Sequence, residues 1–549
     1  MFPNRCALLV ILCAGLGELF ISPVAKAQPN YLIPLPQKGS ATVPNPIALN
    51  NSGQILYDTG LLTGNTFAPF PAGFTVGLLC CPTVMSDSGA VVGNTATGDI
   101  AVYSAGTVTN LGLPPWVPPP PAGNTIPAAT PWAINASGVI VGDSGPFPSF
   151  IYSGGVFNSI NFKIPGQSQP SPPAPTAIND SGQIVLCGPG PGGAPEAFLL
   201  TGQVVTNLPP GCPTAINASG QITGNTGSPR IAHAYIWANG KLTVLAETPP
   251  FTTSAGSWIN KGGQVVGGMS NGQSSVPFFY NGVMTDINSL VSTSDPLKSS
   301  VTIAWVAEIT DSRMLLVVSA QPVVGTSTAY LLQAPWLDVA PGPLTFANQG
   351  VGTTSQPQTL RLTNSGTVPL PLDSISIAAG GAEFSQTNAC PASLAAGADC
   401  TVSVTFSPSA GGSQNSLLDV VTNGATITVP LGGMTPITIS LSANPTTPTV
   451  GQSFTITWTA SPGSTCQSSG GSANDGWLAT TASGSVSVVE TAAGMYTYSM
   501  NCTEGSESTA QSLNITVNPP ASGGGGALDP SSMLLLVGLL ALYYRTKPA

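Results

Sequence analysis

A turn sequence that recurs along the first three hundred residues constrains this chain more than any other feature. Six segments place a polar turn ahead of a glycine and apolar residues after it: IALNNSGQIL, TVMSDSGAVVG, WAINASGVIVG, TAINDSGQIV, TAINASGQITG and SWINKGGQVVG. The aligned glycines are Gly53, Gly89, Gly138, Gly182, Gly220 and Gly263, and a seventh copy, ITDSRMLLV, has Arg313 in the glycine position. The copies follow one another at intervals of 36 to 50 residues. Self-similarity at this spacing predicts a repeat architecture.

Each repeat carries the signals of about four short strands. The turn needs a residue that tolerates positive φ, and the apolar residues after it start a strand. Farther on, apolar segments flank a tight turn, with Asn239-Gly240 and Asn281-Gly282 as favoured hairpin dipeptides. About four strands in about 40 residues is the content of one propeller blade. We therefore predict an all-β, seven-bladed propeller-like domain over residues 28–338, completed by the segment 31–36, with an open β-solenoid or a pair of sandwiches as alternatives.

The repeats also resemble the HAF repeat family of extracellular bacterial proteins, which is named for a His-Ala-Phe triplet ahead of the hairpin. His233-Ala234-Tyr235 matches the triplet with Tyr for Phe. Three other copies keep the aromatic residue and lose the His: Glu196-Ala197-Phe198, Val276-Pro277-Phe278 and Thr328-Ala329-Tyr330. The resemblance covers about residues 30–335 and implies a propeller-like, exported protein with no agreed biochemical activity.

A different pattern of alternating strands begins near Pro335. PLTFANQGVG, Phe384-Ser385 and TVSVTFSPSAGG resemble the ASH-type immunoglobulin-like domain of bacterial surface proteins, which predicts such a β-sandwich over residues 339–435. Within it, Cys390 and Cys400 bracket a nine-residue loop. A local disulfide is the natural assignment, and loop entropy gives it about 2–3 kcal/mol.

Residues 436–520 resemble bacterial Ig-like modules. The likeness implies a β-sandwich with a disulfide between Cys466 and Cys502 and a buried Trp458. The order Trp, Cys, Cys departs from the Cys, Trp, Cys order of antibody domains, so antigen-type recognition is not implied.

The N-terminus predicts export. Arg5, an apolar stretch from Ala7 to Leu16 and the triplet Ala25-Lys26-Ala27 form the pattern of a signal peptide over residues 1–27, cleaved before Gln28. An uncleaved N-terminal anchor is the alternative.

The C-terminus predicts attachment to a membrane. Residues 521–549 contain a glycine run, an apolar segment from Met533 to Tyr544 and then Arg545 and Lys547, and they resemble Gly-rich CTERM sorting tails. A short transmembrane helix over residues 527–544 would have 18 residues, close to the length that spans a bilayer. We expect a protein of the cell surface or outer envelope, or an extracellular protein, with the membrane as a partner through this helix.

Eight cysteines remain after cleavage, an even number that predicts disulfides in an exported chain. Cys81 and Cys212 are repeat-equivalent and belong to different repeats, so we do not expect them to bond to each other. Cys187, in the preceding repeat, is the better partner for Cys212. Cys80 and Cys81 then remain as a vicinal disulfide or as free thiols.

The composition offers little to a catalytic or cofactor site. Charged residues make up 6% of the chain and no basic cluster is present, which excludes nucleic acid as a partner. His233 is the one histidine, so no histidine pair can hold a metal, and we predict no cofactor. Ser86-Asp87-Ser88-Gly89 resembles the Asp-box of sialidases but lacks the aromatic residue after the glycine, which favours a plain turn. Carboxylates are scattered over several repeats at Asp143, Asp180, Glu196, Asp286 and Asp311.

These observations favour a non-enzymatic binding or structural protein of the cell surface, with a glycan or protein ligand. The alternative is a secreted carbohydrate-active propeller enzyme, either a hydrolase or a lyase. Such an enzyme should bring two or more carboxylates within about 10 Å of each other at one mouth of the propeller.

Overall fold

The computed structural model describes residues 30–36, 46–76, 84–119, 128–160, 173–189, 195–227, 232–319, 329–409, 411–461, 464–504 and 507–520. These residues form strands β1 to β44 and one short helix, α1 (Ile287–Leu290). The prediction of an all-β chain is confirmed. The predicted signal peptide, the C-terminal tail and the pair Cys80 and Cys81 lie outside the described residues.

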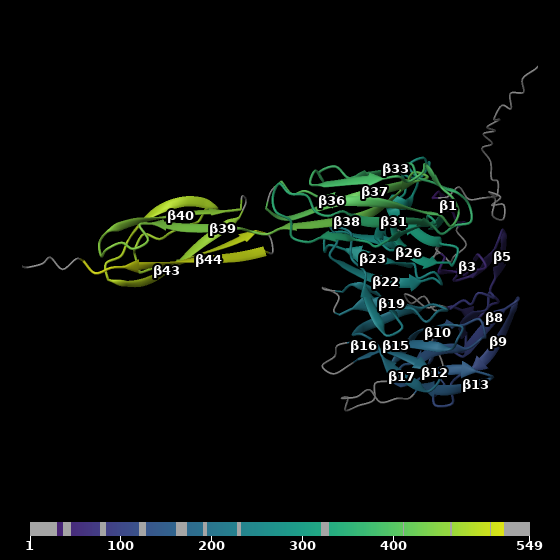
Figure 1. The fold of residues 1–549 in the computed structure, drawn as a ribbon. Coiled ribbons are helices and arrows are strands. Elements are labelled where there is room, and N and C mark those ends of the chain that lie inside the picture. The colour runs from purple at the N-terminus through teal and green to yellow at the C-terminus, as the bar shows by residue number, and fades with distance from the viewer. Residues whose placement is uncertain are drawn as a thin grey trace, which may run out of the picture. The chain divides into compact units, whose positions relative to one another are not determined.

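Seven four-stranded antiparallel sheets account for the repeats (Figure 1). Sheet 1 contains β2 (Ala48–Leu49), β3 (Gln54–Tyr57), β4 (Gly60–Thr63) and β5 (Thr66–Pro69), and sheet 2 contains β6 (Phe74–Thr75), β7 (Val91–Thr95), β8 (Ile100–Ser104) and β9 (Thr107–Gly112). Sheet 3 contains β10 (Thr130–Ile134), β11 (Ile140–Ser144), β12 (Phe147–Ser153) and β13 (Val156–Ile160), and sheet 4 contains β14 (Ala174–Ile178), β15 (Gln183–Pro189), β16 (Pro195–Thr201) and β17 (Val204–Asn207).

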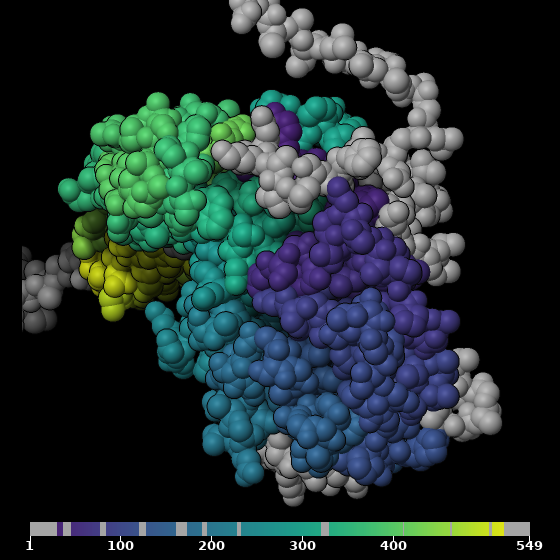
Figure 2. All heavy atoms as spheres, turned by 90° about the vertical axis from the view of Figure 1, so that its right-hand side faces the viewer, coloured from purple at the N-terminus to yellow at the C-terminus, as the bar shows by residue number. Residues whose placement is uncertain are grey.

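Sheet 5 contains β18 (Gly211–Ile216), β19 (Ile222–Thr226), β20 (Ala234–Ala238) and β21 (Lys241–Val244), and sheet 6 contains β22 (Thr253–Ile259), β23 (Val265–Ser270), β24 (Ser275–Tyr280) and β25 (Met284–Asp286). Sheet 7 is different, because β26 (Ile303–Ile309), β27 (Met314–Ser319) and β28 (Ala329–Gln333) are joined by β1 (Leu32–Pro34) from the N-terminus. Leu32 pairs with Leu332 and Pro34 with Tyr330. The predicted completion of the last sheet by the N-terminal segment is therefore confirmed, and Figure 2 shows purple N-terminal atoms beside teal ones.

The repeated turn joins the first and second strands of each sheet. Its glycines have φ between 76° and 82°, the left-handed region that favours glycine. Arg313 adopts φ 60° at the equivalent place in sheet 7. The sequence prediction of a turn with positive φ is right even at the copy that has lost the glycine.

Neighbouring sheets pack face to face through apolar cores. One core joins Ala133 and Val141 of sheet 3 to Leu186 and Phe198 of sheet 4, and a separate core joins sheet 4 to sheet 5. Another core brings together the two ends of the repeat region. It contains Leu35, Leu49, Ile55, Tyr57 and Leu62 from residues 30–76 and Ala307, Leu316, Val318 and Ala329 from sheet 7. Sheet 7 therefore packs on sheet 1.

A disulfide between Cys187 of β15 and Cys212 of β18 links sheets 4 and 5. It joins the pair that the repeat alignment favours.

Residues 337–435 form two four-stranded sheets and a two-stranded one. The first contains β29 (Leu337–Ala340), β31 (Gln358–Asn364), β36 (Asp399–Phe406) and β34 (Phe384–Asn388), and the second contains β30 (Leu344–Phe346), β38 (Ala425–Thr435), β37 (Gly412–Thr422) and β33 (Ser374–Ile377). The small sheet pairs β32 (Leu370–Pro371) with β35 (Ser393–Leu394). Cys390 and Cys400 are bonded as expected.

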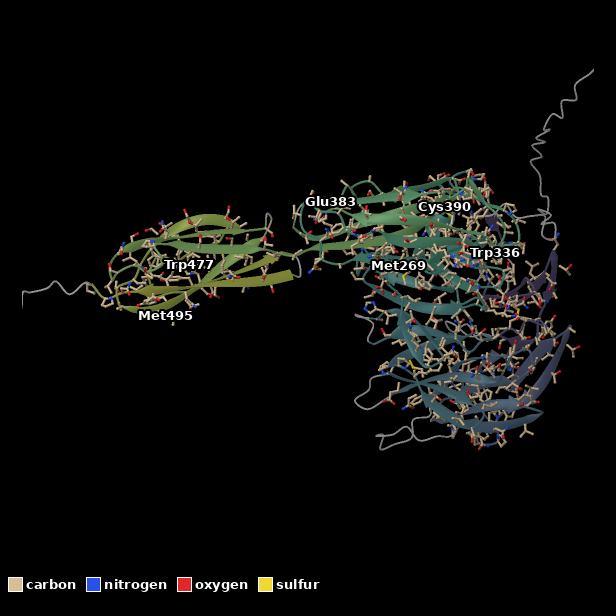
Figure 3. All side chains as sticks on the ribbon, viewed as in Figure 1. Met269, Trp336, Glu383, Cys390, Trp477 and Met495 are labelled. Atoms are coloured by element: carbon tan, nitrogen blue, oxygen red, sulfur yellow. A yellow bond between two sulfur atoms is a disulfide. The ribbon has the colours of Figure 1, made fainter. Side chains whose placement is uncertain are left out.

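Residues 439–517 form two three-stranded sheets around their own core. One contains β39 (Ile439–Asn444), β40 (Ser453–Ala460) and β42 (Ser483–Val489), and the other contains β41 (Thr465–Gly470), β43 (Gly494–Glu504) and β44 (Glu507–Val517). Trp477, labelled in Figure 3, packs edge-on against Trp458 and Tyr498 within this core, whereas Met495 is exposed. Trp458 is thus buried as predicted.

The disulfide between Cys466 and Cys502 is present, but it differs from that of antibody domains. The two cysteines are direct partners on neighbouring strands β41 and β43, so the bond lies within one sheet. In antibody domains the bond crosses between the two sheets. Trp458 lies on β40 in one sheet, and both cysteines lie in the other sheet.

Among the described residues, no helix is both long enough and apolar enough to span a bilayer.

Candidate functional site

The turns of all seven repeats line one cavity of about 290 Å³. Two residues of each turn matter most, and we name them by their place before the repeat glycine. The inner turn position is occupied by Asn50, Ser86, Asn135, Asn179, Asn217, Asn260 and Thr310. The outer turn position, one residue later, is occupied by Asn51, Asp87, Ala136, Asp180, Ala218, Lys261 and Asp311. All of these residues except Thr310 line the cavity.

Wherever the inner turn position holds asparagine, its side chain connects that repeat to the next. The Asn135 side-chain amide donates to the carbonyl oxygen of Asn179 at 3.1 Å, and Asn179 donates to Asn217 at 3.0 Å. The series continues from Asn217 to Asn260 at 2.8 Å and from Asn260 to Thr310 at 3.1 Å. These side chains are buried, so the bonds are made where an unpaired amide would be costly. The asparagine of the repeat therefore holds adjacent turns together, a role that the turn propensity alone did not reveal.

Aspartate at the outer turn position makes a second connection. Asp180 accepts from the backbone N–H of Ala136 at 2.8 Å, and Asp311 accepts from the N–H of Lys261 at 2.7 Å. Asp87 accepts from both the N–H and the side-chain amide of Asn51 at 3.0 Å. Each carboxylate is thus bonded to the turn of the preceding repeat. The Asp-box interpretation of residues 86–89 is not needed, because Asp87 acts in the turn.

The last repeat is connected to the first in the same manner. The backbone N–H of Asp311 donates to the side-chain oxygen of Asn51 at 2.7 Å, and the N–H of Leu49 donates to Glu308 Oε2 at 3.0 Å. These contacts join residues about 260 positions apart in the chain. Hydrogen bonds between turns thus run from repeat three to repeat seven and on through repeat one to repeat two.

Glu308 is the most unusual group of the cavity wall. Burial raises the pKa of its carboxyl to about 8, with a smaller contribution from the negative charge of Asp87, while the hydrogen bond from Leu49 acts in the opposite direction. The side chain is therefore mostly an uncharged acid at neutral pH. An uncharged carboxyl group can donate one hydrogen bond as well as accept others.

This pKa predicts a pH-dependent stability. The folded-state value of about 8 lies above the ordinary 4.5, so the unfolded chain loses its proton first as the pH rises. Between these two values the unfolded state binds fewer protons, and the free energy of unfolding falls with increasing pH. Glu308→Gln cannot titrate, so its stability relative to the unmodified protein should rise by about 2–4 kcal/mol between pH 5 and pH 9. Urea unfolding of both proteins at pH 5, 7 and 9 measures the difference, and a constant difference would contradict the assignment.

The structure separates the other carboxylates that the sequence singled out. Asp180 and Asp311 line the cavity, but Asp143, Glu196 and Asp286 do not. Asp143 lies on β11, where burial raises its pKa, and Asp286 caps helix α1 by accepting from the N–H of Asn288. Glu196 lies on β16.

His233 lies away from the cavity beside β20. Its Nδ1 is 2.8 Å from Glu247 Oε1, and that oxygen also accepts from the Ser254 hydroxyl at 2.6 Å. Glu247 bonds to both groups, whereas a catalytic triad would place the histidine between the serine and the carboxylate. Within the described ranges, no three His, Cys, Asp or Glu side chains are placed to hold a metal ion.

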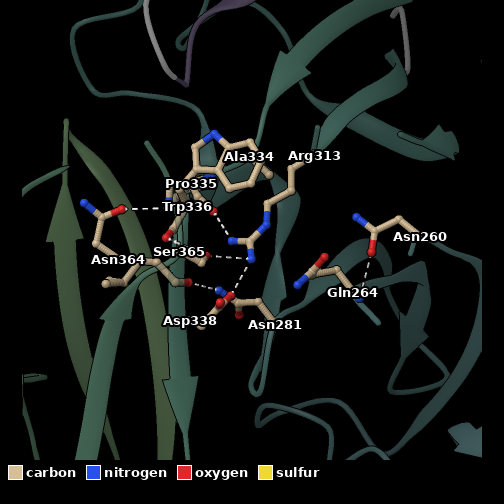
Figure 4. Close-up of polar contacts among 12 residues, drawn as sticks. Asn260, Gln264, Asn281, Arg313, Ala334, Pro335, Trp336, Asp338, Asn364 and Ser365 are labelled. Carbon is tan, nitrogen blue, oxygen red and sulfur yellow. Dashed lines mark hydrogen bonds and ion pairs between the residues drawn. The ribbon is translucent and has the colours of Figure 1, made fainter. Parts of the chain in front are cut away.

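Arg313 joins the last repeat to the segment that follows it (Figure 4). Its guanidinium donates to Pro335 O at 2.9 Å, to Asp338 Oδ1 at 2.6 Å and to Ser365 Oγ at 3.0 Å, and lies 4.9 Å from the ring centre of Trp336. The side chain is 3% exposed. The seventh repeat has arginine where the other repeats have glycine, and this substitution places a buried cation at the junction.

Sequence reasoning missed Glu308 and its neighbour in the cavity wall, Trp258. Both occupy the position five residues before the repeat glycine. The other repeats have Ala48, Val84, Ala133, Ala177 and Ala215 there. A comparison of the repeats at this single position would have identified both residues.

Several solved structures are similar to parts of the chain. A PapD-like ASH domain of human CEP192 is 22% identical, over 18% of this chain and 84% of that one, with a TM-score of 0.16. The extracellular domain of a hybrid two component system from B. thetaiotaomicron is 11% identical, with a TM-score of 0.33. That match covers 89% of this chain and 58% of the other, which is less than two thirds of its length. A fragment of titin is 12% identical over 34% of this chain and 66% of that chain, with a TM-score of 0.21.

No curated protein matches the chain. One family model matches, described as ASH, for abnormal spindle-like microcephaly-associated, ASPM-SPD-2-Hydin, at residues 338–427. These residues include most of the two sheets that follow the repeats, and they contain the disulfide between Cys390 and Cys400. Residues 338–427 are an ASH domain.

Proposed function

We propose that this chain is an exported, non-enzymatic binding protein whose repeat domain is a seven-bladed β-propeller that holds its ligand in the cavity between the turns. One observation carries the proposal. All seven repeats contribute residues to a single cavity, and half of the residues that line it have polar or charged side chains. Small-molecule sites in proteins are concave and combine apolar surface with a few well-placed polar groups.

The propeller itself is supported by three features of the repeat region. The seven sheets are equal in strand number, the N-terminal strand completes the last sheet, and the last turn bonds to the first. Closed repetition of this kind leaves only short strand edges exposed. In this proposal the repeats belong to the HAF type, with blades that correspond to sheets 1 to 7.

Export is supported by the three disulfides, because such bonds persist in oxidising compartments. We propose that the ASH domain and a second Ig-like domain over residues 436–520 carry the propeller at the cell surface. Attachment through residues 527–544 to the membrane stays a prediction from the sequence.

A direct binding screen tests the function. The mature chain beginning at Gln28 is applied to glycan and protein arrays, and we expect saturable binding to one ligand class. Binding should be competed by the free ligand and should be lost when the chain is unfolded and its disulfides are reduced. An absence of binding on every array would overturn the binding function.

A carbohydrate-active enzyme is the second candidate, and Glu308 with Asp87 is the observation that favours it. Burial raises the pKa of Glu308, so that this carboxyl group is mostly uncharged at neutral pH. The negative charge of Asp87 contributes to the raised pKa. Pairs of carboxyl groups held in different protonation states serve as acid and nucleophile or base in glycosidases. Incubation with each glycan that binds, followed by mass spectrometry of products, distinguishes the two candidates. An enzyme would release product, and Glu308→Gln would stop that release.

A further inference from the structure

We propose that Trp258 and Glu308 select the ligand of the cavity and that this ligand is a single neutral, hydroxyl-rich ring such as one sugar residue. This inference rests on the binding function proposed above and specifies its chemistry. It begins with the position five residues before the repeat glycine, where repeats one to five have small apolar residues. Repeats six and seven, which are adjacent, have Trp258 and Glu308 instead.

The two substitutions replace a small apolar side chain by a large or a polar one. The five small residues at this position are buried, so the sheets pack around a small apolar side chain. An indole and a carboxyl group replace that small side chain only in two neighbouring repeats, and both line the cavity. Ala177 and Ala215 line it as well, whereas the equivalent residues of the first three repeats do not. The cavity therefore reaches this position in repeats four to seven and not in repeats one to three.

Trp258 and Glu308 also keep polar atoms free for a ligand. Glu308 Oε2 accepts from the N–H of Leu49, but no donor from the described residues reaches Oε1. The Trp258 indole N–H likewise has no hydrogen-bond partner among the residues that the structure describes. The asparagines at the inner turn position, in contrast, are used in bonds between repeats. The two exceptional residues thus supply a donor and an acceptor that the fold itself does not use.

The chemistry of this pair fits a neutral ring better than a cation. An indole offers a flat apolar surface with one donor at its edge. Because burial keeps Glu308 mostly uncharged at neutral pH, it presents a hydroxyl and a carbonyl oxygen, which suit a partner with several hydroxyl groups. The carboxylates of Asp87, Asp180 and Asp311 also line the cavity, but each accepts from the turn of the preceding repeat. A quaternary cation would favour more than one aromatic ring around it. The volume of about 290 Å³ is at the lower end of small-molecule sites, so one ring fits and a long chain does not.

Ligand-observed NMR with defined small probes tests the inference on the mature chain. The probes are methyl glycosides of glucose, galactose, mannose and N-acetylglucosamine, with tetramethylammonium chloride as the cationic alternative. We expect saturable binding of at least one glycoside and about tenfold weaker binding for Trp258→Ala and for Glu308→Ala, because each loses one side of the site. Glu308→Gln should stay within about threefold of the unmodified protein, since the amide replaces an uncharged acid.

Matched variants separate loss of the site from loss of the fold. Trp305→Ala is the control, because Trp305 is 49% exposed on β26 and is absent from the cavity wall. Trp258→Phe keeps a ring and replaces the alanine variant if circular dichroism shows that the latter is unfolded. The inference fails if only tetramethylammonium binds, if no probe binds, or if a glycoside binds equally to the alanine variants. A chain that binds an array ligand independently of Trp258 and Glu308 would retain the proposed function and lose only this ligand assignment.

Discussion

Deletion of residues 31–36 is expected to lower the free energy of unfolding of the whole repeat region by about 5 kcal/mol or more. The segment contains β1, whose Leu32, like Leu35 just after it, is buried, and full burial of one such side chain contributes about 1.5–3 kcal/mol. The deletion also exposes the edge of β28 and removes the bond from the N–H of Leu32 to Asp295 Oδ2 at 2.6 Å. These losses are comparable to the net stability of a typical domain.

Which sheets lose stability after this deletion distinguishes a closed ring of sheets from an open array. In a closed ring, loss of the last sheet frees both of its neighbours, so sheets 3 to 5 should lose amide protection together with sheets 1 and 7. In an open array each unit depends on its neighbours alone, and distant sheets would stay protected. Calorimetry and hydrogen exchange on the mature chain measure both effects. Tyr31→Phe is the control, because it removes only the exposed hydroxyl bond to Ser294 and should leave the transition unchanged.

Replacement of Arg313 by alanine is expected to destabilise the last repeat and the ASH domain by about 3–5 kcal/mol. The guanidinium is buried and bonds to three acceptors, Pro335 O, Asp338 and Ser365. Its removal leaves the Pro335 carbonyl without this donor and opens a space beside Trp336. The backbone strain of about 1 kcal/mol at φ 60° is common to arginine and alanine, so it does not contribute to this loss. Because the bonds connect the repeat to residues after 334, both regions should melt at lower temperature.

Three variants separate the contributions of Arg313. Arg313→Gly relieves the backbone strain and should recover about 1 kcal/mol relative to alanine. Arg313→Lys keeps the charge but lacks the planar fork that reaches several acceptors, so most of the loss should persist. Arg361→Ala removes an exposed ion pair with Asp399 and should have no measurable effect. Equal melting of Arg313→Ala and the unmodified protein would show that the cluster contributes nothing to stability.

The predictions that came from local chemistry were accurate. The repeated turn requires positive φ wherever it occurs, so its recurrence predicted the seven sheets that the structure shows. Because Cys81 and Cys212 are repeat-equivalent, Cys187 was the predicted partner of Cys212, and the structure has this bond. The short loop between Cys390 and Cys400 predicted their disulfide, which is also present. Each of these inferences depends on residues close together in the chain or related by the repeat.

The candidate site was less accessible to sequence reasoning. Carboxylates were selected by residue type, and of the five, only Asp180 and Asp311 line the cavity. Both accept from a backbone N–H of the preceding repeat, which a residue type does not reveal. Trp258 and Glu308 lie in segments that read as ordinary strand ends. Both residues line the cavity only because the seven repeats bring their turns together, and the order of residues in one strand does not reveal this.

The sequence by itself determined the all-β class and the recurring turn of the seven sheets, because φ preferences, alternating burial and repetition act over short distances. The ASH domain was located by the resemblance of its residues to that family. Only the tertiary structure decided which side chains share the cavity, that burial raises the pKa of Glu308 and that Arg313 is a buried link to Asp338. These properties depend on desolvation and on contacts between residues far apart in the chain, from Leu49 to Glu308 and from Asn51 to Asp311. A burial-induced pKa shift exists only when the surrounding sheets have excluded water.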